Sequence, residues 1–252
     1  MSTLIALDID NTLIYSRKHP HPGWPCVEWI HEEEQAYMSP RTAELYRELC
    51  GEPCVALVTS RSIEQYRRLR LPADAGLAVT ANGADLLVNG ITDPAWRREV
   101  DTLLEPWRDE LLRRFDELKN SAQYIRCRVV DDAYTFVYCA EGVTPEAEVR
   151  HITESTTLDV MASGKKIYLL PPPLNKGAAI RRLMTYLGCE RCIAAGDSAM
   201  DLPMLTAADV AIAPVTMKDL LPQGAMICPS DELFSEYVLK SVRRSINHLC
   251  KR

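Results

Sequence analysis

Short runs of apolar residues that end in polar residues mark both ends of the chain. Near the N-terminus these runs are Thr3–Leu7, Cys54–Val58 and Leu77–Thr80. Continuous apolar runs of this length are typical of strands that are buried on both faces of a parallel sheet. Ligands of such sheets bind beyond the carboxyl ends of the strands, so the polar residues that follow each run are candidates for a site.

Helices are expected between these strands. Ser39 is a favourable N-cap and Pro40 fits the first helical position, so one helix should begin there and stop at Gly51. Another helix should follow Thr59 and continue to about Leu71. Strands and helices that alternate through short connections predict a parallel sheet with right-handed crossovers.

The same alternation returns after Pro171–Pro173, which we interpret as a stiff linker. A helix from Asn175 to Leu187 leads into further predicted elements: strands at Cys192–Ala195, Val210–Ile212 and Ala225–Cys228, and helices at Met200–Leu205 and Glu232–Leu249. The two ends of the chain should therefore build one α/β core.

The middle of the chain has a different pattern. Asn82-Gly83 and Asn89-Gly90 suggest a small hairpin, and the apolar stripe of Trp96–Leu118 suggests a helix that Pro106 kinks or splits. Further elements are expected behind it: strands at Tyr124–Val130, Tyr134–Cys139, Leu158–Met161 and Lys166–Leu170, and a helix at Pro145–Glu154. We predict an α/β core of residues 1–83 and 172–252, interrupted by an inserted α+β domain of residues 84–171.

Residues 15–38 lack a clean periodicity. They contain Pro20, Pro22, Gly23 and Pro25, so they form either a long loop or an inserted hairpin. The segment also carries His19, His21, Trp24, Trp29 and His31, which suit a flap that lines a pocket. A metal site at His19-x-His21 is a weaker reading, because no third ligand is evident.

Composition excludes some classes of partner. The net charge of −6, with no basic block, argues against nucleic acid as the main partner. No stretch approaches the roughly 20 apolar residues of a membrane span. The first apolar run ends at Asp8, too early for a signal-peptide core, so we expect a cytoplasmic protein.

The nine cysteines are scattered and odd in number, and most should be small buried hydrophobes in a reducing compartment. Cys189-x-x-Cys192 has the spacing of a metal or redox pair, but a second such pair is missing. A turn that leads into a buried strand is the simpler interpretation.

Two pairs of acidic residues follow predicted buried strands. Asp8 and Asp10 come after the first strand, and Asp197 and Asp201 come after the strand at Cys192–Ala195. Each pair alone would also fit an ordinary loop. Four carboxylates at one sheet edge would need a hard divalent cation with oxygen ligands, most simply Mg²⁺. One acid could then act as a nucleophile and another as a general acid and base.

Two further residues suit the binding of a phosphoryl group. Thr59 lies at the tip of the second strand, where a hydroxyl and backbone N–H groups can hold phosphate oxygens. Lys176 begins a helix, and a cation there can neutralise a nucleophile and a phosphoryl group. Each alone would fit an ordinary helix cap or a solvated lysine.

Taken together and in this order, these motifs resemble those of the haloacid dehalogenase (HAD) superfamily. Asp8-x-Asp10-x-Thr12 is similar to its first motif, Thr59 to its second, Lys176 to its third and Gly196-Asp197-x-x-x-Asp201 to its fourth. The position of the insert and Asn82-Gly83-Ala84 at its entry resemble subclass IIB, which includes Cof-type, sucrose-phosphate and trehalose-phosphate phosphatases and phosphomannomutases. The resemblance implies a Rossmann-like parallel-sheet core with an open-faced α+β sandwich as a cap.

The resemblance also implies a role for each motif residue. Asp8 would be the nucleophile that forms an aspartyl-phosphate, and Asp10 the general acid and base. Mg²⁺ would be held by the Asp8 side chain, the Asp10 main-chain carbonyl and the Asp197 side chain, with Asp201 as a further ligand or an orienting group. The phosphoryl group would be bound by Thr59, Ser60 and Lys176. Asn11 and Ser60 stand where similar proteins often have Gly, and Asn adopts left-handed conformations readily.

The cap should carry the substrate specificity. Arg126 and Arg128 alternate on one predicted strand and so face the same side, and Lys166 begins another. The same pattern of basic residues would also fit a sheet face that is simply exposed to solvent. Arg61 and Asn82 are candidates on the core side of the pocket.

The favoured function is a Mg²⁺-dependent phosphatase that acts on a small phosphorylated metabolite, in particular a sugar phosphate. A phosphomutase that acts on hexose phosphates shares this cap type and is the alternative. A non-catalytic binding module fits less well, because binding alone does not need both Asp8 and Asp10. We expect neither nucleic acid nor a membrane as a partner, and either a monomer or a homodimer.

Overall fold

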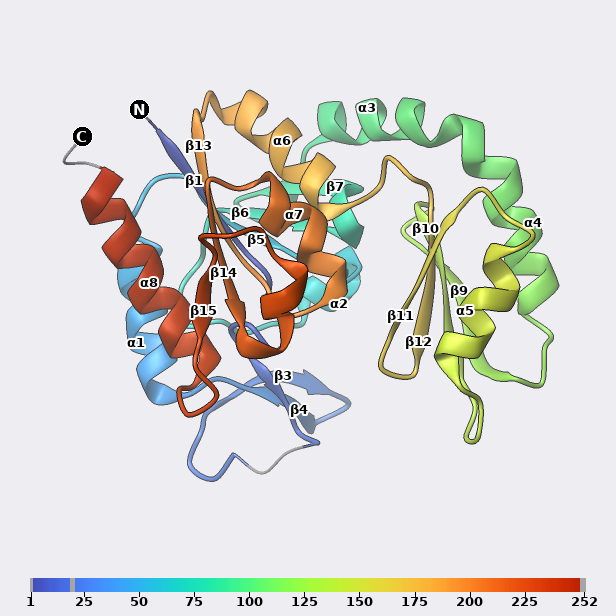
Figure 1. Cartoon of the computed structure of the whole chain (residues 1–252), viewed down its shortest axis with the longest axis horizontal. Helices are drawn as coiled ribbons and strands as arrows, with labels where there is room; N and C mark the ends of the chain where they lie inside the picture. Colours follow the sequence, from blue (N-terminus) through green and yellow to red (C-terminus); the bar gives the residue numbers. More distant parts are fainter. Residues whose placement is uncertain (1, 19–20, 250–252) are drawn as a thin grey trace. The chain divides into compact units, whose positions relative to one another are not determined.

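The computed structural model describes residues 2–18 and 21–249, and these form two compact units (Figure 1). One unit comprises the chain up to Thr92 and from Lys176 onward, and the other is Asp93–Asn175. The sequence suggested an insert of residues 84–171. The inserted unit begins later because residues 85–92 pair with the sheet of the first unit.

The first unit is built on an eight-stranded sheet with the order β15-β14-β13-β1-β5-β6-β7-β8. The pairs from β15 to β6 are parallel, whereas β7 and β8 add an antiparallel hairpin at one edge. The predicted parallel sheet is therefore confirmed. The strands are β1 (Thr3–Leu7), β5 (Val55–Val58), β6 (Leu77–Thr80), β7 (Asp85–Val88), β8 (Ile91–Thr92), β13 (Arg191–Ala195), β14 (Val210–Pro214) and β15 (Met226–Cys228).

Helices cover both faces of this sheet (Figure 1). They are α1 (Pro40–Leu49), α2 (Ile63–Arg67), α6 (Lys176–Leu187), α7 (Leu202–Ala207) and α8 (Phe234–Leu249), with short 3₁₀ turns at η1 (Ala81–Gly83), η3 (Ala199–Asp201) and η4 (Val215–Leu220). Ser39 caps α1 as predicted, because its hydroxyl accepts a hydrogen bond from the amide of Thr42.

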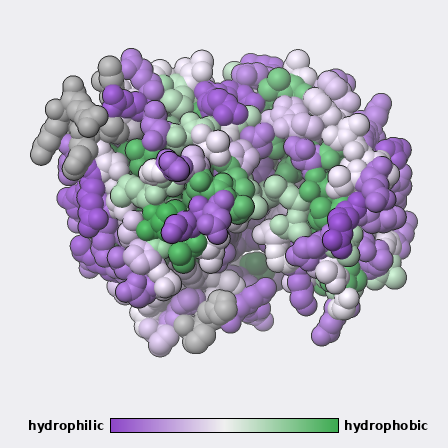
Figure 2. Space-filling view, in the orientation of Figure 1, coloured by the Kyte–Doolittle hydropathy of each residue, from purple (hydrophilic) through white to green (hydrophobic). Residues whose placement is uncertain are grey.

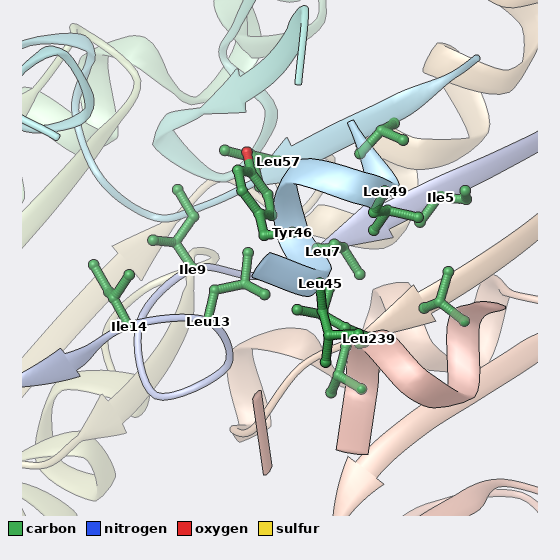
Figure 3. Close-up of a cluster of buried hydrophobic side chains, with 14 of the residues drawn as sticks. Ile5, Leu7, Ile9, Leu13, Ile14, Leu45, Tyr46, Leu49, Leu57 and Leu239 are labelled. Carbon is green, nitrogen blue, oxygen red and sulfur yellow. The ribbon is translucent and has the colours of Figure 1, made fainter. Parts of the chain in front are cut away.

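The main hydrophobic core lies between the sheet, α1 and α8 (Figure 3). Alternate residues of β1 point into it and meet apolar side chains from both helices: Ile5, Leu7, Leu45, Tyr46, Leu49 and Leu239. Burial of such side chains stabilises each by about 1.5–3 kcal/mol relative to exposure, so this core fixes the sheet that carries the site.

Residues 15–18 and 21–38 form the hairpin alternative. Their strands β2 (Tyr15–Ser16), β4 (Glu33–Tyr37) and β3 (Cys26–Ile30) make a three-stranded antiparallel sheet in the order β2-β4-β3. The hairpin also explains why α2 ends at Arg67 and not near Leu71, as predicted from the sequence. Leu69 forms a β-bridge with Glu28, and the amide of Arg70 donates to the carbonyl of Val27, so this stretch is extended and not helical.

The inserted unit is an antiparallel sheet with α4 (Arg108–Leu118) and α5 (Pro145–Thr153) on one face. Its other helical segments are α3 (Pro94–Leu104) and η2 (Glu105–Trp107). Pro106 lies in the 3₁₀ turn that separates α3 from α4, so of the predicted kink or split the structure shows the split. The strands, in sheet order, are β11 (Asp159–Ser163), β12 (Lys166–Leu170), β10 (Tyr134–Cys139) and β9 (Tyr124–Val130).

One face of the inserted sheet packs on α4 and α5. Side chains of alternate strand positions, Val137, Ile167 and Leu169 among them, join Leu111 and Ile152 in a second hydrophobic cluster. The opposite positions form the other face of the sheet. The observed α/β core and inserted α+β sheet confirm the predicted fold class.

Hydrophilic side chains cover much of the surface seen in Figure 2, and apolar patches interrupt them. Among the helices of the described residues, none is long and apolar enough to cross a membrane.

Candidate active site

Three strand ends bring the predicted site residues of the core together. Asp8 follows β1, Thr59 follows β5 and Gly196 follows β13, and β1 lies between the other two in a parallel arrangement. Backbone hydrogen bonds continue the sheet into the site, because the amide of Asp8 donates to the carbonyl of Ala195 at 2.9 Å. The carboxyl ends of neighbouring parallel strands share one edge, so these residues converge.

Asp8 lies at the centre of this edge and is buried. Its Oδ1 accepts a hydrogen bond of 2.5 Å from Nζ of Lys176, and its Oδ2 accepts one of 3.1 Å from Oγ1 of Thr12. Asn11 has a φ of 56°, which is the left-handed conformation that its side chain was expected to allow. The loop after β1 therefore turns back on itself and holds the Asp8 carboxylate in one orientation.

Lys176 reaches Asp8 because the start of α6 approaches α7 closely. The next residue is Gly177, where an added Cβ would lie 2.3 Å from the carbonyl oxygen of Pro203. No side chain fits there, so glycine is required for this approach. Lys176 is only 2% exposed, and its ammonium group also donates to Oδ1 of Asp201 at 2.5 Å.

Asp201 organises the loop after β13. Its Oδ2 accepts from the amides of Asp197 and Ser198 at 3.1 and 3.0 Å, and from the Ser198 hydroxyl at 2.8 Å. Gly196 permits this fold, because a Cβ there would lie 2.4 Å from the Cβ of Asp201. Both carboxylate oxygens of Asp201 already have donors, so this residue orients Lys176 and the loop.

We call Asp8, Asp197, Asp201 and Lys176 the acidic cluster. Within the part of the chain that the structure describes, its three carboxylates are the group that could hold a metal ion, with ligand atoms within 4.8 Å of one another. Three carboxylates face one ammonium group, so the cluster carries excess negative charge. A hard divalent cation with oxygen ligands fits this set, and Asp8 and Asp197 have the carboxylates best able to bind it.

The pKa values reflect the same imbalance. Burial raises the pKa of Asp8 well above its usual range; Lys176 opposes this shift, and Asp201 and Asp197 add to it. Burial, together with the charge of Asp201, raises the pKa of Asp197 to about 7. Burial lowers the pKa of Lys176, but Asp201 and Asp8 more than offset this, so its pKa is raised and the amine stays protonated.

The Asp10 side chain pairs with Arg61. The guanidinium group donates from Nε to Oδ2 of Asp10 at 2.8 Å and from Nη2 to Oδ1 at 2.7 Å. The side chain of Asp10 is 49% exposed, whereas that of Arg61 is 13% exposed. Arg61, a predicted candidate for the pocket, is thus placed beside the second acid.

Thr59 and Asn82 are adjacent on the same sheet edge. Thr59 is fully buried, its Oγ1 accepts from the amide of Arg61 at 3.1 Å, and its carbonyl accepts from the amide of Asn82 at 3.0 Å. Asn82 is buried with a φ of 58°, and neither the nitrogen nor the oxygen of its side-chain amide has a hydrogen-bond partner. Ser60 follows Thr59 at an ordinary negative φ, so glycine is not needed there.

The three basic candidates of the inserted unit share the sheet face that α4 and α5 leave uncovered. The register pairs Tyr138 with both Arg126 and Lys166, and it pairs Phe136 with Arg128 and Tyr168. Arg126 and Lys166 are exposed, and the guanidinium group of Arg128 lies 5.6 Å from the Phe136 ring centre.

Glu28 is the site residue that sequence reasoning missed. It lies in β3 of the hairpin and is only 4% exposed, and it contacts Arg61. A single glutamate in a short strand has no local signal for such a contact.

Two of the residues suggested for a flap contact each other: His21 stacks on Trp24 with ring centres 4.5 Å apart. His19, another of them, lies outside the described residues. Cys189, in the turn before β13, and Cys192, within β13, are buried free thiols.

Residues 115–219 match a family model described as haloacid dehalogenase-like hydrolase. No curated protein sequence matches the chain.

Several solved structures share the fold over almost the whole chain. The sucrose-phosphatase of Synechocystis sp. PCC6803, in complex with sucrose and phosphate, has a TM-score of 0.65 and 18% identity and covers 97% of this chain and 98% of that chain. A trehalose-6-phosphate phosphatase related protein has a TM-score of 0.56 and 21% identity, and the match covers 99% of this chain and 100% of that chain. A haloacid dehalogenase-like hydrolase from B. subtilis has a TM-score of 0.59 and 18% identity, and the match covers 94% of this chain and 98% of that chain. The chain therefore shares the fold of these hydrolases and phosphatases, and residues 115–219 are similar to the haloacid dehalogenase-like hydrolase family.

Proposed function

We propose that the protein is a Mg²⁺-dependent phosphatase that hydrolyses a small phosphorylated metabolite through an aspartyl-phosphate on Asp8. One observation carries the proposal. The Asp8 carboxylate is held between Lys176 and Thr12 in a cluster whose negative charge exceeds its positive charge. Such a site favours a divalent cation and an anionic group that the cation and the lysine bind together.

In the first step Asp8 attacks the phosphorus atom and forms a P–O bond, while the bond to the leaving oxygen breaks. The leaving oxygen takes the electron pair of that bond and a proton from Asp10. Lys176 stabilises the negative charge that develops on the phosphoryl oxygens. The Thr59 hydroxyl, the Ser60 backbone and the unpartnered amide of Asn82 supply further polar groups at this edge.

In the second step a water molecule attacks phosphorus and the bond to Asp8 breaks. Asp10 takes the proton of the water, so it acts first as a general acid and then as a general base. Its half-exposed position allows it to exchange protons with solvent between turnovers.

The Asp8 and Asp197 side chains, with the main-chain carbonyl of Asp10, would hold Mg²⁺. The ion supplies charge neutralisation and orients the phosphate. Asp201 positions the other residues, because its oxygens accept hydrogen bonds from Lys176 and from the amide of Asp197.

A sugar phosphate is the substrate class that we propose. The similar sucrose-phosphatase holds sucrose and phosphate, and the face of the inserted sheet that α4 and α5 leave uncovered carries exposed cations of the kind that bind anions. These cations are Arg126 and Lys166, and the half-buried Arg128 lies over the Phe136 ring on the same face. A division of labour between the core and a substrate-selecting cap follows from this proposal, and a cytoplasmic monomer or homodimer stays a prediction.

Phosphate release from 4-nitrophenyl phosphate and a panel of sugar phosphates tests the proposal. Activity should require Mg²⁺ and should disappear with a chelator. Asp8→Asn should lower the rate by at least ~10³-fold, because the nucleophile is lost. Asp219→Asn, an exposed change of the same chemistry in the same unit, is the matched control and should act like the wild type.

Retained activity in Asp8→Asn would contradict the mechanism. Conversion of a hexose 1-phosphate to a hexose 6-phosphate, without release of free phosphate, would favour the phosphomutase alternative.

A further inference from the structure

The Arg61 guanidinium group is shared between two carboxylates. Its Nε and Nη2 donate to Asp10 at 2.8 and 2.7 Å, while Nη2 and Nη1 contact Oε2 and Oε1 of Glu28, each at 2.9 Å. Arg68 adds a longer contact of 3.4 Å to Glu28. We call these four residues the arginine cluster; its two positive charges balance its two negative charges.

Arg61 has little freedom in this arrangement. Its amide donates to Oγ1 of Thr59 at 3.1 Å, and its carbonyl accepts from the amide of Ala81 at 2.8 Å. The remaining Nη1 proton is directed at the carbonyl of Gln65 at 3.4 Å. Since each N–H group of the fork has an acceptor, the plane of the guanidinium group is set by where its acceptors lie.

Glu28 is the acceptor that the hairpin supplies. The backbone around it is joined to the core unit, because Glu28 forms a β-bridge with Leu69 and the carbonyl of Val27 accepts from the amide of Arg70 at 2.7 Å. The carboxylate is therefore a fixed, buried anchor, whereas Asp10, at the other side of the same fork, is half-exposed.

We infer that Glu28 is a positioning residue for Asp10. It holds the Arg61 fork in the orientation that fixes the second acid, and the inserted hairpin thereby takes part in proton transfer at the site. This inference rests on the proposed function, because it assigns a partner to the general acid and base of that reaction.

Such a role has a kinetic signature that depends on the leaving group. A sugar or alkyl leaving oxygen needs the proton of Asp10 as its bond to phosphorus breaks, whereas a nitrophenolate leaves without it. A loosened Asp10 should therefore slow the first turnover on sugar phosphates and spare the first turnover on 4-nitrophenyl phosphate. It should also slow attack by water, so that aspartyl-phosphate accumulates.

Glu28→Gln tests the inference in the full-length protein with Mg²⁺. We expect the first-turnover rate on a sugar phosphate to fall by about 10–100-fold, the scale of a misplaced catalytic group. The release of nitrophenolate in the first turnover, measured by rapid quench and normalised to active sites, should change by less than about 3-fold, because this step needs little proton transfer. Asp10→Asn should show the same selectivity more strongly, and Glu28→Gln should add nothing in the Asp10→Asn background.

Glu33→Gln is the matched control, because Glu33 lies in the same hairpin and makes an exposed ion pair with Arg17. It should behave as the wild type. Glu28→Asp keeps the charge but shortens the side chain; it should show the same selectivity to a smaller degree, and it replaces Glu28→Gln if that variant does not fold.

Equal losses on both substrates in the Glu28 variants, or no loss, would overturn the inference. If Asp10→Asn lost more activity on sugar phosphates than on 4-nitrophenyl phosphate and Glu28→Gln did not, the inference would be overturned while the proposed function stands. A wild-type protein that releases no phosphate from any substrate would instead overturn the proposed function itself.

Discussion

Two ionic clusters lie near the carboxyl end of β1, and they are built on opposite principles. In the acidic cluster three carboxylates surround one ammonium group, and the pKa values of Asp8 and Asp197 are raised. In the arginine cluster two carboxylates meet two guanidinium groups, and the charges balance. The first arrangement attracts a cation from solution. The second has no such need and instead fixes the direction of a side chain.

The largest expected effect comes from removing the one cation of the acidic cluster. Lys176→Met leaves buried carboxylates without a counter-charge, which should lower the free energy of unfolding by about 3–5 kcal/mol in the presence of a chelator. Addition of Mg²⁺ should restore part of this loss. Glu28→Gln leaves Arg61 with Asp10 as a partner, so its cost should be only about 1–3 kcal/mol. Urea denaturation measures both.

Lys240→Met is the control for this comparison, because Lys240 pairs with Glu236 on the surface of α8 and should contribute little. If Lys176→Met were as stable as the wild type without metal, the stability of the acidic cluster would not depend on its ionic balance. The two clusters would then not differ in the way described above.

A smaller effect should follow from metal binding to the wild type. A divalent cation at 100 times its Kd should stabilise the protein by about 2.7 kcal/mol. The effect should depend on pH, because the folded pKa of Asp197, about 7, lies above its unfolded value of about 3.9. The stability that this proton gives is present at low pH and is lost as the pH rises through about 7.

Without metal, the free energy of unfolding should therefore fall between about pH 4 and about pH 7, while Mg²⁺ should reduce the fall because the cation replaces the proton. Thermal unfolding at several pH values, with EDTA or Mg²⁺, measures this. A metal effect as large at pH 5 as at pH 8 would speak against the imbalance that we assign to the acidic cluster.

The smallest effect should come from the scaffold of the arginine cluster. Ser62 and Gln65 form a reciprocal capping box at the start of α2, with the Gln65 amide donating to Oγ of Ser62 at 3.2 Å. Ser62→Ala should cost about 1 kcal/mol, and Ser62→Asn, which keeps a capping oxygen, should cost less. Neither change should alter the Mg²⁺ dependence of stability, and a change in that dependence would mean that the two clusters are coupled.

The acidic cluster was predictable from the sequence because each of its residues has a local signal. Asp8 and Asp197 follow buried strands, and Lys176 begins a helix after three prolines. The split of the long helix at Pro106 was predictable for the same reason, since proline acts on its own backbone.

The arginine cluster depends on contacts that no local pattern encodes. Arg61 was a candidate only through its place beside Thr59, and Glu28 gave no signal at all. The early end of α2 has the same cause, because Leu69 and Arg70 pair with the hairpin and not with their neighbours in sequence. The start of the inserted unit was predicted too early for a related reason. The sequence of the β7–β8 hairpin does not indicate whether the hairpin pairs with the core sheet or belongs to the insert.

The order of strands in the core sheet has a consequence for synthesis on the ribosome. β1 pairs with β5 on one side and with β13 on the other, but β13 belongs to the last quarter of the chain. The segment between Thr92 and Arg191 takes about 5–20 s to translate at about 5–20 residues per second. Throughout that interval the emerging N-terminal half-sheet has β1 as an unpaired apolar edge. An apolar edge of this kind is a template for pairing with other chains, so the order of strands leaves β1 open to such pairing until β13 emerges.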